Sequence, residues 1–387
     1  WWKRSGRLQP GDVPSNLVRW SNLQSHGRDP MSRESKDAPG TEPGHESNEP
    51  TVLSGPWFEE LETGDLFTDA PAVTVTEGHA ALYQAIFGDR QRLPLDAHLC
   101  ARVTGSEKLL VNSGLVCNVA IGQTTYASQR VMGNLFYRGL IFKAPVYIGD
   151  TLTTTTKVVA LRQNRIREGR AASGMVALEI GVKNQRGGQV MLFWRCPMIP
   201  CKDPAADTGR QDSFDELPQQ LTLSEVTDAV PDWGLNEFRD RVHGNHFTEL
   251  VSGSKLIVES RDTVTSAPEL TRMTLNMAMT HLDATRSVYG KRLVYGGHTI
   301  SIAAAQMTRA LPNIVTIVGW RSCDHSAPVF EQDLLRSEVT LGEKYALKSG
   351  GGLVDVQIEV YATRGSEAPE SGDDIKVLDW HLVGLFA

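Results

Sequence analysis

An internal repeat constrains this chain more than any other feature of its sequence. Three landmarks occur twice in the same order, with offsets of 189, 183 and 183 residues. They are "FEELETGD" and "FTELVSGS" from Phe58 and Phe247, the Gly-led "SGLVCNVAIGQTT" and "GGHTISIAAAQMT" with Gly114 and Gly297, and "APVYIGDTL" and "APVFEQDLL" from Ala144 and Ala327. A fixed order at a nearly constant offset is the signature of a duplicated structural unit.

The repeat and the length of 387 residues predict two homologous domains. We place them at residues 56–205 and 235–387, joined by a polar linker over 206–234 that includes "DPAADTGRQDSFDELPQQ". Residues 1–55 are rich in Ser, Pro, Gly, Asn and charge and have no sustained apolar period. We expect them to form a disordered N-terminal extension.

Each copy contains one segment that predicts a buried helix and several that predict strands. The Gly-led segment is apolar on nearly every side, which is typical of a helix enclosed by other elements. The segments that follow it are rich in Val, Ile, Leu and Thr and are separated by turn residues, which favours strands. An antiparallel sheet wrapped around one long buried helix is a hot-dog unit, and such units pair sheet edge to sheet edge. We therefore predict an α+β chain with a tandem (double) hot-dog fold.

Composition excludes several classes of function. The net charge of −7 provides no basic field for nucleic acid. The longest apolar stretches are far shorter than the roughly 20 residues that span a bilayer, so we expect no membrane segment. Five cysteines without a CxxC pair argue against a zinc ribbon or a disulfide framework and for a reducing, cytoplasmic location. The chain also lacks clustered metal ligands and a Gly-rich phosphate loop, so we expect neither a metal nor a cofactor.

The segment "MTLNMAMTHLDATRSVYGKRLVYGGHTI", Met273 to Ile300, carries the strongest chemical signal. It resembles the active segment of MaoC-like, type 2 enoyl-CoA hydratases. The closest resemblance is to the hydroxyacyl-thioester dehydratase branch, in which an Asn precedes a His-x-Asp and a Gly-containing helix start follows. The duplicated architecture also resembles the mesaconyl-CoA hydratase-like branch. The resemblance extends over both predicted domains, from Phe58 to the end of the chain.

The resemblance implies a hydro-lyase that acts on acyl-CoA thioesters. The reaction would be the reversible hydration of a 2-enoyl-CoA to a 3-hydroxyacyl-CoA. Hydration of mesaconyl-CoA (2-methylfumaryl-CoA) and dehydration of β-methylmalyl-CoA are the specific forms that it suggests. The implied partner is the acyl-CoA substrate, bound by a monomeric double hot-dog or a homodimer, with no nucleic acid and no membrane.

The family pattern places the catalytic histidine at His281. Hydration needs a group that takes a proton from water near neutral pH, and an imidazole does this without large tuning. The common pattern has an Asp five residues earlier, where this chain has Asn276. An amide can hold a water or steer an imidazole but cannot accept a proton. Either His281 performs both proton transfers or Asp283 assists, unless Asp283 only caps the turn.

The predicted start of the second buried helix, at Gly296 and Gly297 after Tyr295, is the candidate oxyanion site, with the N–H of Gly297 as the first choice of donor and that of Gly296 as the alternative. Helix N-termini offer free N–H groups and the positive end of the helix dipole. Such donors, placed on a thioester oxygen, would stabilise the charge that develops in an enolate, a contribution of roughly 3 kcal/mol in comparable sites. The alternative is that the glycine pair serves only a turn.

The first copy departs from this pattern. His98 stands 183 residues before His281 but lacks the surrounding motif, and Pro94 stands five residues after Asp89. We expect this copy to be catalytically degenerate and to shape the acyl pocket, with Asp89 as a turn residue.

Several basic and polar residues are weaker candidates. An Arg cluster is interpreted as a solvated hairpin tip rather than a phosphate site, and "GWRSCDHSAP" as a segment that could line the mouth of the pocket. A dicarboxylic substrate would need a cation, for which three arginines are candidates. These residues are Arg162, Arg165, Arg167 and Arg170 in the cluster, Arg321, Asp324 and His325 in the segment, and Arg286, Arg292 and Arg321 as candidate cations.

Two alternatives to a hydro-lyase remain at this point. A hot-dog thioesterase would use a carboxylate near the helix start, where the sequence has none nearby. A non-catalytic acyl-CoA-binding protein would account for Asn276 and the damaged first copy.

Overall fold

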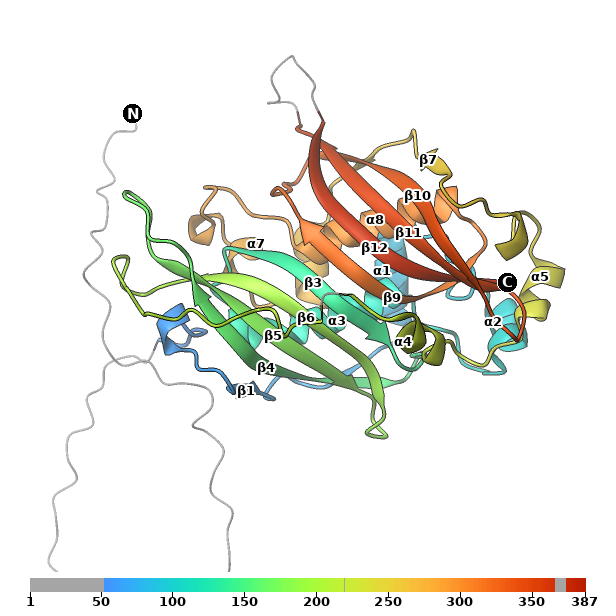
Figure 1. Cartoon of the computed structure of the whole chain (residues 1–387), viewed down its shortest axis with the longest axis horizontal. Helices are drawn as coiled ribbons and strands as arrows, with labels where there is room; N and C mark the ends of the chain where they lie inside the picture. The colour runs from blue at the N-terminus through green and yellow to red at the C-terminus, as the bar shows by residue number, and fades with distance from the viewer. Residues whose placement is uncertain (1–51, 219, 366–373) are drawn as a thin grey trace, which may run out of the picture.

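The computed structural model describes residues 52–218, 220–365 and 374–387 (Figure 1). Most of the extension predicted to be disordered, residues 1–51, therefore lies outside the described residues. Its last part is packed: Gly55 is buried, and its N–H donates to the side-chain oxygen of Gln129 at 3.0 Å. The packed chain thus begins slightly before the predicted boundary at residue 56.

In the described part of the chain, twelve antiparallel strands form one sheet. The path through it is β1-β4-β5-β6-β3-β9-β12-β11-β10-β7, with β2 beside β4 and β8 beside β10. The strands are β1 (Leu66–Phe67), β2 (Val73–Thr74), β3 (Gly133–Phe142), β4 (Thr151–Gln163), β5 (Ser173–Lys183), β6 (Gln189–Pro200), β7 (Lys255–Ile257), β8 (Asp262–Thr263), β9 (Ile314–His325), β10 (Leu334–Ala346), β11 (Gly352–Thr363) and β12 (Ile375–Phe386).

The sheet path has the same order in both halves, read outward from its centre. Strands β3, β6, β5 and β4 follow one another on one side, and β9, β12, β11 and β10 on the other. The halves meet where β3 pairs with β9, for example at Tyr137 and Cys323. This is the edge-to-edge pairing expected of two hot-dog units, and the double hot-dog prediction is confirmed. Residues 56–205 and 235–387 remain our proposed domain bounds.

One long helix per half lies against the sheet, α3 (Ser113–Gln123) and α8 (Gly296–Ala310). They are the predicted Gly-led helices, and nearly every residue in them is buried because their sequences are apolar on most sides. The two helices contact each other: the Asn118 amide donates to Ser301 Oγ at 2.9 Å. Figure 1 shows both helices packed beneath the curved strands.

Shorter helices surround the sheet margins and the connecting loops. The α-helices are α1 (Glu77–Phe87), α2 (Ala97–Thr104), α4 (Leu223–Asp228), α5 (Leu235–Arg241), α6 (Ala267–Met273) and α7 (Met279–Leu282). The 3-10 turns are η2 (Phe58–Glu60), η3 (Thr124–Ser128), η4 (Phe247–Glu249) and η5 (Ala284–Arg286). In the part of the chain that these elements cover, we find no helix long and apolar enough to cross a bilayer.

The segment over 206–234 is more structured than a polar linker. It contains α4, which begins at a capping box formed by Thr222 and Glu225. Leu217, Leu221 and Val226 are buried in it. The prediction of a polar linker is therefore wrong in this respect: the segment connects the two halves, but it also packs against them.

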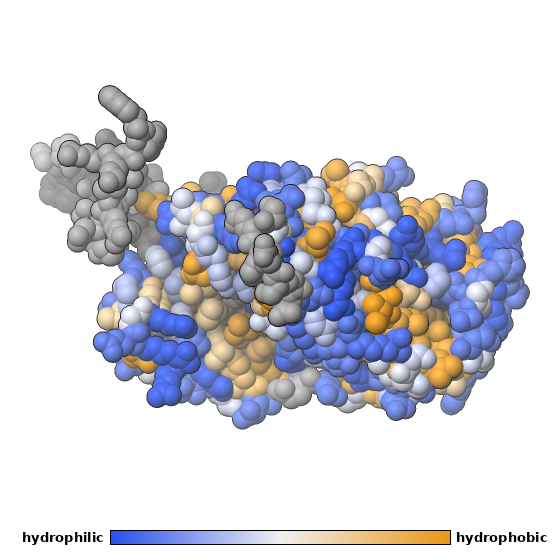
Figure 2. Space-filling view, turned by 90° about the horizontal axis from the view of Figure 1, so that it is seen from above, coloured by the Kyte–Doolittle hydropathy of each residue, from blue (hydrophilic) through white to orange (hydrophobic). Residues whose placement is uncertain are grey.

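The core lies between the sheet and the two long helices. Its largest enclosed side chains include Trp380, Tyr83, Tyr137 and Phe193. The face seen in Figure 2 is mostly hydrophilic, with apolar residues in separate groups. All five cysteines are buried and unpaired, as expected for a chain without a disulfide framework.

Candidate active site

A cavity of about 220 Å³ lies where the two halves meet, and both contribute to its walls. The second half contributes α7, the start of α8 and the end of β9, whereas the first half contributes η3, β3 and β6. The lining residues are Ile121, Thr125, Ser128, Val131, Met132, Gly133, Asn134, Leu135, Tyr137, Arg195, Met198, Asn276, Ala278, His281, Tyr289, Leu293, Val294, Tyr295, Gly296, Thr299, His325, Ser326, Ala327, Pro328 and Val329.

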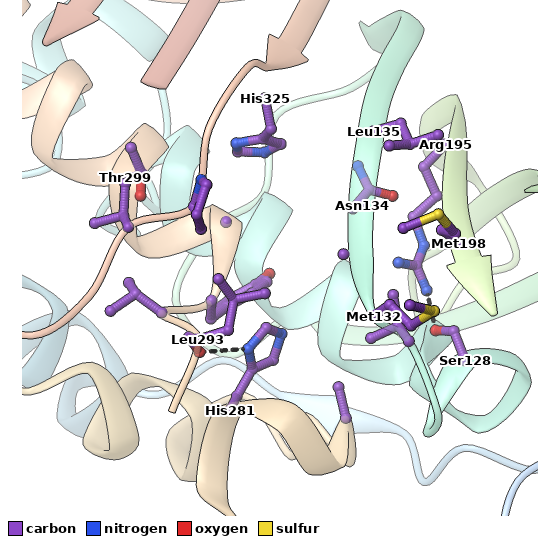
Figure 3. A pocket seen from close by; sticks show the side chains of 18 of the residues that line it. Ser128, Met132, Asn134, Leu135, Arg195, Met198, His281, Leu293, Thr299 and His325 are labelled. Atoms are coloured by element: carbon purple, nitrogen blue, oxygen red, sulfur yellow. Dashed lines mark hydrogen bonds between the residues drawn. The ribbon is translucent and has the colours of Figure 1, made fainter. Parts of the chain in front are cut away.

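His281 projects into this cavity from α7 (Figure 3). Its Nδ1 lies 2.8 Å from the carbonyl oxygen of Leu293. Because a carbonyl can only accept, Nδ1 carries the proton in the neutral ring and Nε2 keeps a lone pair. Burial lowers the pKa of His281 to about 4, and the nearby charge of Arg195 acts in the same direction. At neutral pH the residue is therefore an uncharged imidazole that can accept a proton at Nε2.

Asn276 also lines the cavity, and only 4% of its surface is exposed. Its Oδ1 accepts the N–H of Ala278 at 2.9 Å, so the amide N–H₂ group points elsewhere. That group has no acceptor among the described residues. Asn276 therefore presents donors, not an acceptor, to a ligand. It does not steer the imidazole of His281, because the Leu293 carbonyl performs that task.

The turn that carries Asn276 is held by the first half of the chain. Leu275 adopts a left-handed conformation with φ of 55°, which is unfavourable for a residue with a branched side chain. The preceding carbonyl of Thr274 packs against Gly122 of α3, where an added Cβ would lie 1.9 Å from the oxygen. The Met277 N–H then donates to Thr125 Oγ1 at 2.9 Å. The position of Asn276 thus depends on α3 and η3.

Asp283 lies outside the cavity and is exposed. Its Oδ1 accepts the N–H of Thr285 at 2.9 Å and the Thr285 hydroxyl at 2.7 Å, which caps η5. These hydrogen bonds lower the pKa of its carboxyl group. The suggestion that Asp283 assists His281 is therefore not supported, and the alternative of a turn cap describes its position.

Tyr295, Gly296 and Gly297 form the start of α8, as predicted. The N–H groups of Gly296 and Gly297 have no acceptor among the described residues, as is usual for the first turn of a helix. Gly296 lines the cavity, whereas Gly297 faces inward, where an added Cβ would lie 2.0 Å from Asn118 Oδ1. The sequence predicts Gly297 as the first choice of oxyanion donor, but Gly296 is the residue that lines the cavity together with His281.

His325, only a minor candidate from sequence, lies on the same wall at the end of β9 (Figure 3). An added Cβ on Gly296 would lie 2.7 Å from its Nε2, so the ring covers the helix start. This Nε2 is buried and has no partner among the described residues. Burial lowers the pKa of His325 to about 4, so this imidazole is also neutral at pH 7.

Arg195, on β6, is the residue of this site that the sequence analysis missed. The three arginines considered as cations are paired or face Asp283 instead: Arg292 binds Glu331, Arg321 binds Asp355, and Arg286 lies 4.0 Å from Asp283. Arg195 lines the cavity and is only 3% exposed. The available signal was one charged residue within the apolar strand "QVMLFWRCPMI".

The corresponding site in the first half is smaller and mostly apolar, with a volume of about 40 Å³. Several of its lining residues stand 183 positions before residues of the cavity. Phe142 replaces His325, Val116 replaces Thr299 and Ser113 replaces Gly296. Ala229, Pro231 and Trp233 of the linker cover it. No carboxylate or imidazole lines it, which fits the expectation that the first copy is degenerate.

The remaining candidates of the first half lie elsewhere. His98 is exposed on α2, and the position that corresponds to Asn276 is the buried Leu93. Asp89 accepts the Gln91 N–H at 2.9 Å, as a turn residue does, and also the Asn112 amide at 3.0 Å. In the hairpin between β4 and β5, Arg165, Arg167 and Arg170 are exposed, as a solvated tip would be.

The cavity offers a base and several hydrogen-bond donors but no acid. Among its lining residues there is no Asp or Glu. We also find no group of three or more His, Cys, Asp or Glu side chains that could hold a metal, within residues 52–218, 220–365 and 374–387. The site therefore suits proton transfer and oxyanion binding at neutral pH.

Comparisons with known proteins agree with this arrangement. No family model matches the chain. It is 29% identical over 317 residues to beta-methylmalyl-CoA dehydratase of Chloroflexus aurantiacus, covering 80% of this chain and 88% of that protein. It is also 29% identical over 291 residues to mesaconyl-CoA hydratase of Cereibacter sphaeroides, covering 73% of this chain and 82% of that protein.

Two solved structures resemble the whole fold. A conserved hypothetical protein from Mycobacterium tuberculosis with a double hotdog fold is 43% identical, with a TM-score of 0.79, covering 86% of this chain and 99% of that one. A MaoC domain protein described as a dehydratase, from Chloroflexus aurantiacus, is 26% identical, with a TM-score of 0.71, covering 86% and 97%. With its duplicated sheet, its two central helices and these relatives, the chain belongs to the MaoC-like double hot-dog family.

Proposed function

We propose that this protein catalyses the reversible hydration of a 2-enoyl-CoA to a 3-hydroxyacyl-CoA. The observation that carries the proposal is the state of His281. Its Nδ1 is committed to the Leu293 carbonyl, so Nε2 is left as a neutral base. It shares one cavity with Gly296, whose N–H at the start of α8 has no acceptor among the described residues. A base and an oxyanion site in one small cavity are what the addition of water to an enoyl thioester requires.

In this mechanism His281 and Asn276 hold the attacking water. The water donates one hydrogen to Nε2 of His281, and its oxygen accepts from the free Nδ2 group of Asn276. Proton transfer to Nε2 activates the water, and its oxygen forms a bond to C3 of the enoyl group. The C2–C3 π electrons move toward the thioester carbonyl. Asn276 thus serves as a donor to water, a role for which an amide suffices.

The thioester oxygen would accept the N–H of Gly296. The enolate charge that develops on this oxygen is stabilised by that donor and by the positive end of the α8 dipole. The protonated His281 then returns its proton to C2, which completes the addition of H and OH. One residue performs both transfers, because no Asp or Glu among the described residues lines the cavity to share them.

The two curated relatives guide the choice of substrate. Their names refer to mesaconyl-CoA and β-methylmalyl-CoA, and we propose this pair as the first substrates to test. The thioesterase alternative is weakened because no carboxylate lines the cavity. The cytoplasmic location and the choice between a monomer and a homodimer stay predictions.

A spectrophotometric assay of the purified chain on crotonyl-CoA and mesaconyl-CoA tests the proposal. Loss of enoyl absorbance without release of free CoA is the expected result for at least one of these substrates. Release of free CoA would instead identify a thioesterase. Binding of both thioesters without any turnover would identify a non-catalytic acyl-CoA-binding protein.

The histidine pair provides the matched variants for this assay. His281→Ala should lower turnover by at least about 100-fold, the usual scale for a lost general base, with folding and CoA binding retained. His98→Ala changes the corresponding residue of the other copy, which is exposed on α2, and should have little effect. An inactive His98→Ala beside an active His281→Ala would reverse the assignment of the catalytic copy.

A further inference from the structure

We infer that Arg195 binds a carboxylate group on the acyl chain of the substrate, so that the cavity selects dicarboxylic acyl thioesters. This inference rests on the proposed function, which places an acyl-CoA in the cavity. It goes further by assigning a residue to the recognition of one part of the substrate. The argument depends on the partners that Arg195 has, on those that it lacks, and on the size of the cavity.

The guanidinium group of Arg195 is buried without a counter-charge. Its Nη2 donates to Ser128 Oγ at 2.5 Å and to the Thr124 carbonyl at 3.4 Å. Its Nε is buried and has no acceptor, and no carboxylate of the described residues lies within ion-pairing distance. An arginine stays charged in proteins, and a buried charge without a partner carries a desolvation cost of several kcal/mol. An anionic ligand would compensate that cost.

The other half of the chain shows that the fold itself does not require this cation. Arg195 pairs with Tyr137 between β6 and β3. In the second half, Trp320, which stands 183 residues after Tyr137, pairs with Leu382 between β9 and β12. An apolar residue therefore occupies the corresponding strand position, fully buried. An arginine therefore occupies this strand position in the first half, where β6 lines the catalytic cavity, and not in the second half.

The position of Arg195 favours the far end of an acyl chain over the phosphates of CoA. Figure 3 shows Arg195 across the cavity from His281 and His325. A thioester held between His281 and Gly296 would extend its acyl group toward this wall. The volume of about 220 Å³ suits a short acyl chain, and it is below the roughly 300–1,000 Å³ of pockets that enclose drug-sized ligands. The nucleotide part of CoA is too large for this volume and would remain outside the cavity.

Two neighbouring hydroxyl groups complete a site for a carboxylate. Ser128 Oγ accepts from Arg195, so its own hydrogen is available for another acceptor. The hydroxyl of Tyr295 is buried without a partner, and burial raises its pKa well above the usual range, so it remains a donor. Arg195, Ser128 and Tyr295 all line this one cavity, and a charged donor combined with neutral donors is typical of carboxylate recognition.

Binding of succinyl-CoA and butyryl-CoA, measured by titration calorimetry, tests the inference. These saturated thioesters have four-carbon acyl chains, and only succinyl-CoA ends in a carboxylate. Neither can be hydrated, so the result does not depend on catalysis. We expect the full chain to bind succinyl-CoA at least roughly 30-fold more tightly, the scale of a desolvated charge pair. A ratio of dissociation constants near one would overturn the inference.

The substitution Arg195→Leu introduces the residue type of the second half and should reduce this preference to about one. Arg102→Leu, which changes an exposed arginine on α2, should leave the preference as in the native chain. Equal weakening of both thioesters by Arg195→Leu would mean that Arg195 binds a CoA phosphate, which also overturns the inference. Circular dichroism checks that the variant folds, and Arg195→Gln is the substitute if it does not.

These outcomes separate the inference from the proposed function. A preference for succinyl-CoA that depends on Arg195, in a protein that hydrates neither enoyl-CoA, would support the carboxylate site and reject the hydratase. Hydration of crotonyl-CoA and mesaconyl-CoA with equal efficiency, and no binding preference, would support the hydratase and reject the carboxylate site.

Discussion

The charge state of one imidazole decides whether this cavity can start a hydration. His281 lies in surroundings that lower its pKa to about 4, with burial as the main cause. A low pKa weakens the imidazole as a base but keeps it unprotonated over a wide pH range. The Leu293 carbonyl fixes which nitrogen carries the hydrogen. The free Nε2 is therefore available as a base at neutral pH.

We predict that hydration stays fast under mildly acidic conditions. A base must be unprotonated to act, so its contribution is lost as the pH falls through the pKa of the folded protein. For His281 this loss occurs near pH 4, not near the value of 6.5 of a solvated histidine. The ratio kcat/KM should therefore change less than about twofold between pH 7.5 and 5.5.

The measurement is kcat/KM for the active enoyl-CoA at half-unit pH steps. Circular dichroism at each pH confirms that the protein is folded. A decline centred near pH 6.5 would show that the imidazole is well solvated, and the description of the cavity as a low-pKa site would then be wrong.

At the residue scale, sequence reasoning found the groups that belong to a motif. His281, Asn276 and the glycine pair have a fixed spacing, so their proximity to the helix start could be predicted. Arg195 could not be placed in this way, because its approach to the cavity depends on the pairing of β6 with β3 and not on local spacing. For Asp283 the sequence left two alternatives open, and the structure shows the turn cap, because two residues along a turn suffice to point a side chain away from its neighbour.

At the scale of elements, the catalytic turn of the second half depends on a helix of the first. The backbone of Thr274 lies against Gly122, and the Met279 N–H donates to the Gln129 carbonyl at 2.8 Å. These contacts hold Leu275 at its positive φ and bring Asn276 to the cavity. The first half is therefore part of the active site although it has no catalytic histidine of its own.

Gly122→Ala should consequently impair catalysis, although Gly122 lies on α3, a helix that carries no reacting group. The added methyl group would overlap the Thr274 carbonyl, whose oxygen would lie 1.9 Å from it, so the turn must shift. Because a misplacement of about 1 Å can cost 100-fold in rate, we expect kcat to fall by at least about 10-fold. The KM value should change less, since the walls that hold the acyl chain stay in place.

Gly181→Ala is the matched control for this steady-state comparison. Gly181 lies on β5, where an added Cβ would meet only the Gln189 side chain, at 3.8 Å. This variant should retain the native kcat. A Gly122→Ala variant with native kcat would mean that the turn adjusts without moving Asn276, and that its position is not fixed by α3.

At the scale of elements, sequence patterns were sufficient to predict some helices and strands but not others. The helices α3 and α8 and the long strands were predictable because their apolar residues recur along the chain itself. The helix α4 within the supposed linker was not, because Leu221 and Val226 stand among polar residues and an exposed Leu223, and they become buried only against distant strands. Local composition described that segment as polar, whereas its packing depends on contacts that the sequence order does not reveal.

For the molecule as a whole, duplication followed by divergence has produced one larger site with polar side chains and one smaller, mostly apolar site. Both halves keep the sheet order and the central helix, but the residues at corresponding positions have changed. The cavity that holds His281 remains beside α8, and its counterpart beside α3 is lined by Leu110, Phe142 and other apolar residues. Trp233 of the linker also lines this counterpart. A chain with a single active site thus retains the packing of a two-fold structure.

We predict that the smaller site of the first half contributes to stability and not to catalysis. Trp233 is partly buried against the apolar cluster that includes Leu110 and Phe238. Its replacement by Ala removes that contact and leaves a cavity, so the free energy of unfolding should fall by roughly 2–4 kcal/mol. The value of kcat/KM should stay within about twofold of native, because Trp233 does not line the cavity that holds His281. Urea denaturation and the enoyl-CoA assay give the two measurements.

Leu223→Ala, at an exposed position of α4 in the same segment, is the control and should change the unfolding free energy by less than about 0.5 kcal/mol. If Trp233→Ala proves as stable as this control, the packing of Trp233 in the first site does not stabilise the fold. If it loses activity while remaining folded, the two sites are coupled through the central pair of helices and the first copy is not merely structural.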